Sequence, residues 1–244
     1  MDDGGLLGAL WRDGLALADA AARAGLEAAV PSCPGWSVRD LVWHTGEVHE
    51  FWRSIVEHGW QDPSQYVEPD RPDDDALLDW YRHGVDATAQ LLTMADPATP
   101  VWSWAPRGGT AGWVIRRMAQ ETAVHRWDAE DAAGDPPPID AELASDGIDE
   151  YLEHFTDNGA EGAAALDGSV HLHCTDVAGE WLVTEPEPGG RLDVRREHAK
   201  GDVAVRGPAS DLLLALWRRR PLAGLDVIGD ADVAQRFIDR TNLD

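Results

Sequence analysis

One face of the segment 113–133 carries three ionisable side chains among apolar ones. At helical spacing this face holds Val114, Met118, Glu121, His125, Asp128 and Ala132. A glutamate is almost never fully buried unless it is paired or bound to a metal, so an inward-facing Glu121 needs a compensating group. Glu121 and His125 are four residues apart, project side by side, and could bind one ion together.

A second helical segment, 37–59, offers another histidine. Leu41, His44, Val48, Phe51 and Ile55 recur at intervals of three and four, so we expect His44 to face the bundle interior. Ser37 followed by Asp40 is typical of a capping box at the start of a helix. Helical bundles build metal sites from side chains on facing helices, and His44 could join such a site.

Two imidazoles and one carboxylate form a ligand set that suits zinc. Three protein ligands leave one position open for water or substrate, as catalytic zinc sites do. Asp128, one turn beyond His125, could orient that ligand through a hydrogen bond. A buried His–Glu–Asp hydrogen-bond network without metal explains the same spacing. The spacing leaves both interpretations open, because it does not show that the two helices face each other.

The order of elements predicts an α+β fold with two domains. We expect a four-helix bundle over 1–135, with helices at 6–25, 37–59, 74–95 and 113–133. A proline run at 136–138 then predicts a boundary. The second domain, 136–244, should hold helices at 140–156, 210–220 and 231–241 and strands at 169–176, 179–185, 191–197, 202–207 and 225–230.

Composition limits the partners and the compartment. With 45 acidic against 20 basic residues, the 244-residue chain carries a formal net charge of -25. Nucleic acids and anionic membranes are bound chiefly through Lys and Arg, so we expect neither as a partner. We see no secretory signal and no apolar run long enough to span a membrane, which predicts a cytoplasmic protein. Cys33 and Cys174 are too few for a disulfide framework; a single bridge remains open, but two free thiols are expected.

Two strings in the first half resemble the mycothiol-dependent maleylpyruvate isomerase family. They are CPGWSVRDLVWHTGEVHEFW at 33–52 and ETAVHRWDAEDAAG at 121–134. DVAVRGPASDLLLALWRRRPL at 202–222 is similar to a segment of that family's second domain, so the resemblance covers essentially the whole chain. It implies a DinB-like four-helix bundle followed by a small α+β domain of the SCP2-like, sterol-carrier type. It also implies that His44, Glu121 and His125 hold the metal, since the family uses a His on the second helix and an E-x-x-x-H pair on the fourth.

The resemblance implies a cofactor and a reaction class as well. The cofactor would be mycothiol, a low-molecular-weight thiol, which zinc or another divalent metal would deprotonate. The thiol would add to a small electrophile, in a cis–trans isomerisation or an S-transfer. The family places a catalytic arginine from the second domain at the site; Arg219 is the best match, and Arg218 and Arg206 are alternatives. A solvated basic helix end explains the three consecutive arginines equally well.

Two other functions stay open. A metal-dependent hydrolase would need a general base, and Asp128 is the nearby candidate. A regulatory protein could retain the bundle and the metal without activity.

Four further residues look chemically capable but are better explained otherwise. Cys33 precedes a Pro-Gly turn and a helix start, which favours a structural role over a nucleophilic one. His49 lies on a face adjacent to His44, and a packing or surface role is favoured. His171 and His173 share one face of a strand, a spacing that also binds metals, but we find no third ligand nearby and expect a solvated strand face.

Overall fold

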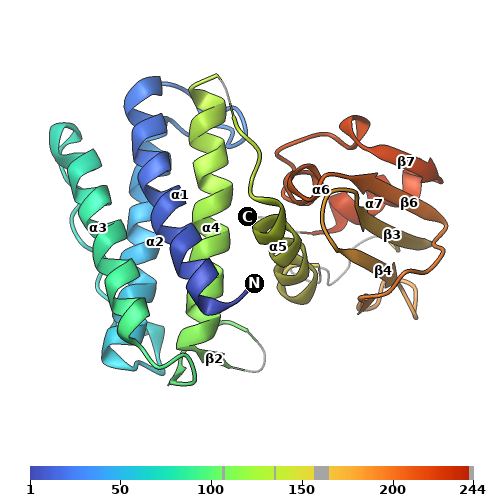
Figure 1. The fold of residues 1–244 in the computed structure, drawn as a ribbon, viewed down its shortest axis with the longest axis horizontal. Helices are drawn as coiled ribbons and strands as arrows, with labels where there is room; N and C mark the ends of the chain where they lie inside the picture. The colour runs from blue at the N-terminus through green and yellow to red at the C-terminus, as the bar shows by residue number, and fades with distance from the viewer. Residues whose placement is uncertain (106–107, 135, 157–164, 242–244) are drawn as a thin grey trace. The chain divides into compact units, whose positions relative to one another are not determined.

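The protein folds into two compact units in a computed structural model that describes residues 1–105, 108–134, 136–156 and 165–241. The first unit is Met1–Pro137 and the second is Pro138–Asp244. Helices make up most of the first, and a sheet with three helices makes up the second. The predicted α+β fold is confirmed (Figure 1). No helix in the described ranges is long and apolar enough to cross a membrane.

Four long helices form the bundle of the first unit. They are α1 (Asp3–Ala24), α2 (Val38–His58), α3 (Asp74–Met94) and α4 (Ala111–Ala132). Each of α1 and α2 contacts both α3 and α4, so the four helices enclose a common core (Figure 1). Leu17, Leu41, Leu77, Tyr81 and Val85 are buried there with no exposed surface.

Side-chain caps lie at the N-termini of α2 and α4, the two helices that carry the predicted site. Ser37 accepts a hydrogen bond from the backbone N–H of Asp40, and the Asp40 side chain accepts one from the N–H of Ser37, which completes the predicted capping box of α2. Thr110 caps α4 by accepting from the N–H of Trp113. Thr110 also belongs to a short hairpin of β1 (Pro100–Val101) and β2 (Gly109–Thr110), which the sequence analysis did not predict. A 3₁₀ turn, η1 (Pro63–Gln65), lies between α2 and α3.

The second unit is built on a five-stranded sheet. Its elements are α5 (Ala141–His154), β3 (Ser169–Cys174), β4 (Glu180–Thr184), β5 (Asp193–Arg195), β6 (Val203–Gly207), α6 (Ala209–Leu216), η2 (Leu222–Gly224), β7 (Asp226–Gly229) and α7 (Ala231–Arg240). The strand order is β5-β4-β3-β6-β7, and every pair is antiparallel except β3 with β6. The predicted strands are all present.

The two faces of this sheet differ. Val170 and Leu172 of β3, with Val203 and Val205 of β6, are buried on the face that α6 and α7 contact. Because side chains alternate along a strand, His171 points to the opposite face. His171 is only 6% exposed. The expectation of a solvated strand face is therefore wrong for His171.

Helix α6 ends earlier than predicted. The helix predicted over 210–220 ends at Leu216. Arg218 adopts a left-handed φ of 58°, its N–H donates to the carbonyl of Ala215, and the N–H of Arg219 donates to the carbonyl of Leu214. This pair of bonds is a Schellman cap, which glycine usually provides. The guanidinium of Arg218 donates to the carbonyls of Ile238 and Thr241, and these bonds offset the cost of the left-handed backbone.

Candidate metal centre

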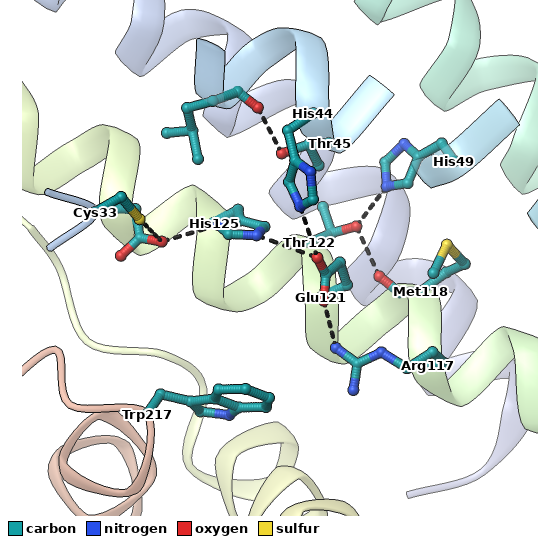
Figure 2. Close-up of polar contacts among 12 residues, drawn as sticks. Cys33, His44, Thr45, His49, Arg117, Met118, Glu121, Thr122, His125 and Trp217 are labelled. Carbon is teal, nitrogen blue, oxygen red and sulfur yellow. Dashed lines mark hydrogen bonds and ion pairs between the residues drawn. The ribbon is translucent and has the colours of Figure 1, made fainter. Parts of the chain in front are cut away.

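The contact between α2 and α4 brings the three predicted ligands together (Figure 2). Nε2 of His44 lies 3.4 Å from Oε1 of Glu121, and Nε2 of His125 lies 3.1 Å from the same oxygen. One donor atom from each residue lies within 4.8 Å of the other two. Helical spacing predicted Glu121 and His125 as ligands, and a separate periodicity predicted His44. The structure brings all three side chains to one place in the bundle.

These distances fit a divalent metal. In a tetrahedral zinc site with ligands about 2.0–2.1 Å from the ion, neighbouring donor atoms are about 3.3 Å apart. The separations of 3.4 and 3.1 Å are close to that value. The donor set, two imidazole nitrogens and a carboxylate oxygen, also matches what zinc prefers in proteins. The side chains present can therefore hold such an ion.

Asp128 orients His125. Its Oδ2 lies 2.8 Å from Nδ1 of His125, and Asp128 has no exposed surface. The hydroxyl of Ser32 donates to the other carboxylate oxygen at 2.6 Å. A carboxylate accepts hydrogen bonds, so Nδ1 of His125 carries the proton. Nε2 is then the nitrogen that faces Glu121 and is left to bind a metal, as in carboxylate–histidine–zinc arrangements.

Arg117 is a partner of Glu121 that the sequence analysis missed. Its Nη2 lies 2.6 Å from Oε2 of Glu121, and its side chain is 5% exposed. Burial alone would raise the pKa of Glu121, but the positive charges of His125 and Arg117 outweigh it and hold that pKa well below its usual range. The signal was available, because Arg117 precedes Glu121 by four residues on one helix.

The same charges act on His125. Burial alone would lower its pKa, but the charge of Glu121 and the hydrogen bond to Asp128 raise the pKa of His125 to about 9. Without a metal, His125 is therefore a cation near neutral pH, and it lies between two carboxylates. A divalent cation bound at Nε2 would replace the proton there and satisfy Glu121, while Asp128 keeps its hydrogen bond from Nδ1.

His44 lies at the rim of the bundle core and not inside it. Its side chain is 36% exposed, whereas His49, five residues later, is fully buried. The predicted interior face of α2 is thus displaced: Thr45 and His49 are buried where Val48 and Phe51 were expected. A half-exposed His44 leaves one side of the ligand cluster accessible.

His49 has a packing role, as the sequence analysis favoured. Its Nε2 lies 2.7 Å from the hydroxyl oxygen of Thr122, which itself donates to the carbonyl of Met118. Thr122 therefore accepts from Nε2 of His49. Burial lowers the pKa of His49 to about 4, so the ring is neutral near pH 7.

Trp36 and Cys33 border the cluster from the turn that precedes α2. The ring of Trp36 contacts those of His44 and His125, with centroids 4.9 and 6.4 Å apart. Sγ of Cys33 lies 3.7 Å from Oδ2 of Asp128, and neither Cys33 nor Cys174 forms a disulfide. The contact with Asp128 is consistent with the structural role expected for Cys33.

The candidate arginines lie in the second unit and differ in their partners. Arg206 lies 3.6 Å from a carboxylate oxygen of Asp226, and Arg220 lies 2.6 Å from one of Asp211. Arg218 is used in the cap of α6. Arg219 follows that cap; its guanidinium donates to the carbonyl of Trp217 and lies 5.9 Å from the ring centroid of the same residue.

Both units of the chain match models of known protein families. A family model described as the mycothiol maleylpyruvate isomerase N-terminal domain matches residues 7–130, and one described as the MDMPI C-terminal domain matches residues 142–236. No curated protein sequence matches the chain.

Two solved structures share the fold. A crystal structure of the mycothiol-dependent maleylpyruvate isomerase covers 93% of both chains with a TM-score of 0.63 and 12% sequence identity. One of a histidine-to-alanine mutant of that enzyme gives a TM-score of 0.61 at the same coverage and identity. Together the two family models span most of the chain, and the chain belongs to the mycothiol maleylpyruvate isomerase family of enzymes.

Proposed function

We propose that this chain holds a zinc ion through His44, Glu121 and His125 and uses it to activate mycothiol for addition to a small electrophile. The observation that carries the proposal is the convergence of three donor atoms on one point, at separations of 3.1 and 3.4 Å from Oε1 of Glu121. Zinc lowers the pKa of a thiol that it binds and so supplies a nucleophilic thiolate at neutral pH.

The surrounding residues prepare each ligand for this task. Arg117 engages Oε2 of Glu121, which leaves Oε1 for the ion. Asp128 fixes the tautomer of His125 and directs Nε2 toward the same point. With three protein ligands, a tetrahedral ion keeps one position for an exogenous group. The exposed side of His44 supports access for a small thiol.

Two reactions follow from the same thiol addition. In an isomerisation, the thiol sulfur adds to an activated cis double bond, the new single bond rotates, and the thiol leaves again to give the trans product. In an S-transfer, the adduct is kept. The solved relatives named as mycothiol-dependent maleylpyruvate isomerases support the first. We propose that Arg219, the position that the resemblance to the family assigns to this role, supplies the positive charge that an anionic substrate needs.

The proposal is tested by metal content and thiol binding. We expect wild-type protein, purified without chelators, to hold one zinc ion more per chain than His125→Ala, and to bind mycothiol at least tenfold more tightly. His83→Ala serves as the control, since His83 is exposed on α3. Equal zinc content and equal mycothiol affinity in wild type and His125→Ala would overturn the proposal.

The same assays separate the alternatives. A hydrolase would cleave a thiol conjugate without added mycothiol, and a regulatory protein would bind mycothiol but turn over no electrophile. Asp128, the candidate base for a hydrolase, is buried and already accepts from His125 and Ser32. These hydrogen bonds to Asp128 argue against a hydrolase, because a general base must reach the attacking water.

A further inference from the structure

A second group of potential metal ligands lies in the sheet unit. It consists of His171 and His173 on β3, Glu180 on β4, and His198 in the connection between β5 and β6. One donor atom from each of the four residues lies within 4.8 Å of the other three. We call these four residues the sheet cluster. It shares no residue with the bundle site.

The sheet topology explains why these residues meet. His173 pairs directly with Glu180 across β3 and β4, and His171 is two residues from His173, so all three point to one face. The chain then leaves β5 at one edge and must pass β4 and β3 to reach β6. That crossing carries His198 over the same face, where its ring centroid lies 5.3 Å from that of His171.

All three imidazoles approach the same carboxylate oxygen. Oε2 of Glu180 lies 3.0 Å from Nε2 of His171 and 3.3 Å from Nδ1 of His173, and it also contacts Nδ1 of His198. A carboxylate oxygen has two lone pairs, so it does not satisfy three donors at once. The separations of 3.0 and 3.3 Å for His171 and His173 are close to the spacing of about 3.3 Å between neighbouring donors around tetrahedral zinc, and His198 approaches the same oxygen more closely.

We infer that the sheet cluster is a second metal site, which binds a divalent transition-metal ion such as zinc through three histidines and Glu180. Imidazole is a good ligand for zinc, copper and nickel, and a carboxylate completes four-coordination. Four protein ligands close the coordination sphere, which is typical of a structural zinc site. The four side chains run from 8% exposed for His171 to 78% for His198, so the ion would enter from the solvent side.

The ion would hold the crossing connection against the sheet. His198 is exposed and lies outside the strands, whereas the other three ligands lie on paired strands. A bond from His198 to an ion held by those three joins the segment 196–202 to β3 and β4. Metal binding of this kind stabilises the folded state, because the four ligands converge only after folding.

The test counts ions on the full-length chain. Zinc content after dialysis against zinc buffer should be two ions per chain for wild type, one for His198→Ala, one for His125→Ala and none for the double variant. His83→Ala should keep both. His198 is mostly exposed, so its loss should leave the fold intact. Wild-type content and affinity in His198→Ala would overturn the inference, whatever His125→Ala does.

A second variant distinguishes a built site from adventitious zinc on a surface histidine. His171→Gln removes the buried ligand and leaves His173 and His198 in place. In the His125→Ala background, Co²⁺ should give the visible absorption of a four-coordinate site, and His171→Gln should abolish it and weaken zinc binding at least tenfold. Zinc binding that survives His171→Gln unchanged would show an adventitious ion only. Failure at the sheet cluster leaves the proposal for the bundle site untouched, because the two counts are independent.

Discussion

Nδ1 of His125 lies 2.8 Å from Oδ2 of Asp128, a carboxylate with no exposed surface. The two residues are three apart on α4, so helix geometry alone holds them on one face. Glu121 meets the other nitrogen of the same ring at 3.1 Å. One turn on either side of His125 thus supplies an acid, and each nitrogen of the imidazole has a partner on the same helix.

We expect Asp128→Asn to weaken zinc binding at the bundle site by about 10- to 100-fold, because the amide no longer fixes the tautomer of His125 or raises its basicity. Equilibrium competition with a chelator measures the affinity. Asp70→Asn, at an exposed position, is the control. If Asp128→Asn lowers stability but leaves the zinc affinity unchanged, Asp128 serves packing and not the ligand.

Arg117→Met should destabilise the metal-free protein by about 3 kcal/mol, because it removes one of the two buried cations that pair with the carboxylate of Glu121. Zinc supplies positive charge to the same carboxylate, so it should raise the Tm of Arg117→Met by more than that of wild type. Thermal unfolding with and without zinc measures both effects. Arg82→Met breaks an exposed ion pair with Asp19 and should cost less than about 1 kcal/mol. Equal zinc stabilisation of Arg117→Met and wild type would contradict a bond between the ion and Glu121.

His49 should make the protein sensitive to mild acid. Its folded pKa of about 4 lies below the ordinary value of 6.5, so between these pH values the unfolded chain binds a proton that the folded chain does not. Stability should therefore fall as the pH drops from 6.5 to 4, by about 3 kcal/mol in all. His49→Gln keeps a donor for Thr122 and removes the titration. Urea unfolding at pH 7 and pH 4.5 should show a smaller loss for His49→Gln than for wild type, whereas His83→Gln should behave as wild type.

Arg219→Gln should lower kcat/KM for an anionic electrophile at least tenfold, and Arg220→Gln should change it less than twofold. Arg220 is exposed and paired with Asp211. Arg220→Gln therefore removes one positive charge from the same segment while leaving Arg219 in place. The kcat/KM values of the two variants are compared from steady-state rates at saturating mycothiol. Equal losses in the two variants would assign the effect to general electrostatics and not to Arg219.

Helix periodicity predicted most of the bundle and the chemistry-bearing face of α4. That face is unusual, because Glu121, His125 and Asp128 replace apolar residues on a buried stripe, and such a departure is visible in the sequence. The meeting of His44 with Glu121 was not visible, since spacing within one helix does not determine its neighbours. The resemblance to the family linked α2 with α4, and the distances in the structure agree with that pairing.

Other errors came from contacts between elements distant in the sequence. The end of α6 was predicted too late because Arg218 takes a left-handed conformation without being glycine, and its partners Ile238 and Thr241 belong to the end of the chain. His171 and His173 lacked a third ligand in the sequence analysis because Glu180 joins them through strand pairing and His198 through a crossing connection. Local patterns contain neither relationship.

The two groups of metal ligands close loops of different length in the chain. His44 and His125 belong to the second and fourth helices of the bundle, whereas His171 lies on β3 and His198 in the connection between β5 and β6. The loop between the outer ligands is about three times longer in the bundle, which costs about 1 kcal/mol more closure entropy. The sheet ligands can therefore assemble once β3 to β6 have paired, while the bundle ligands must wait for α2 to dock on α4. Bringing the outermost ligands together therefore costs less conformational entropy in the sheet than in the bundle.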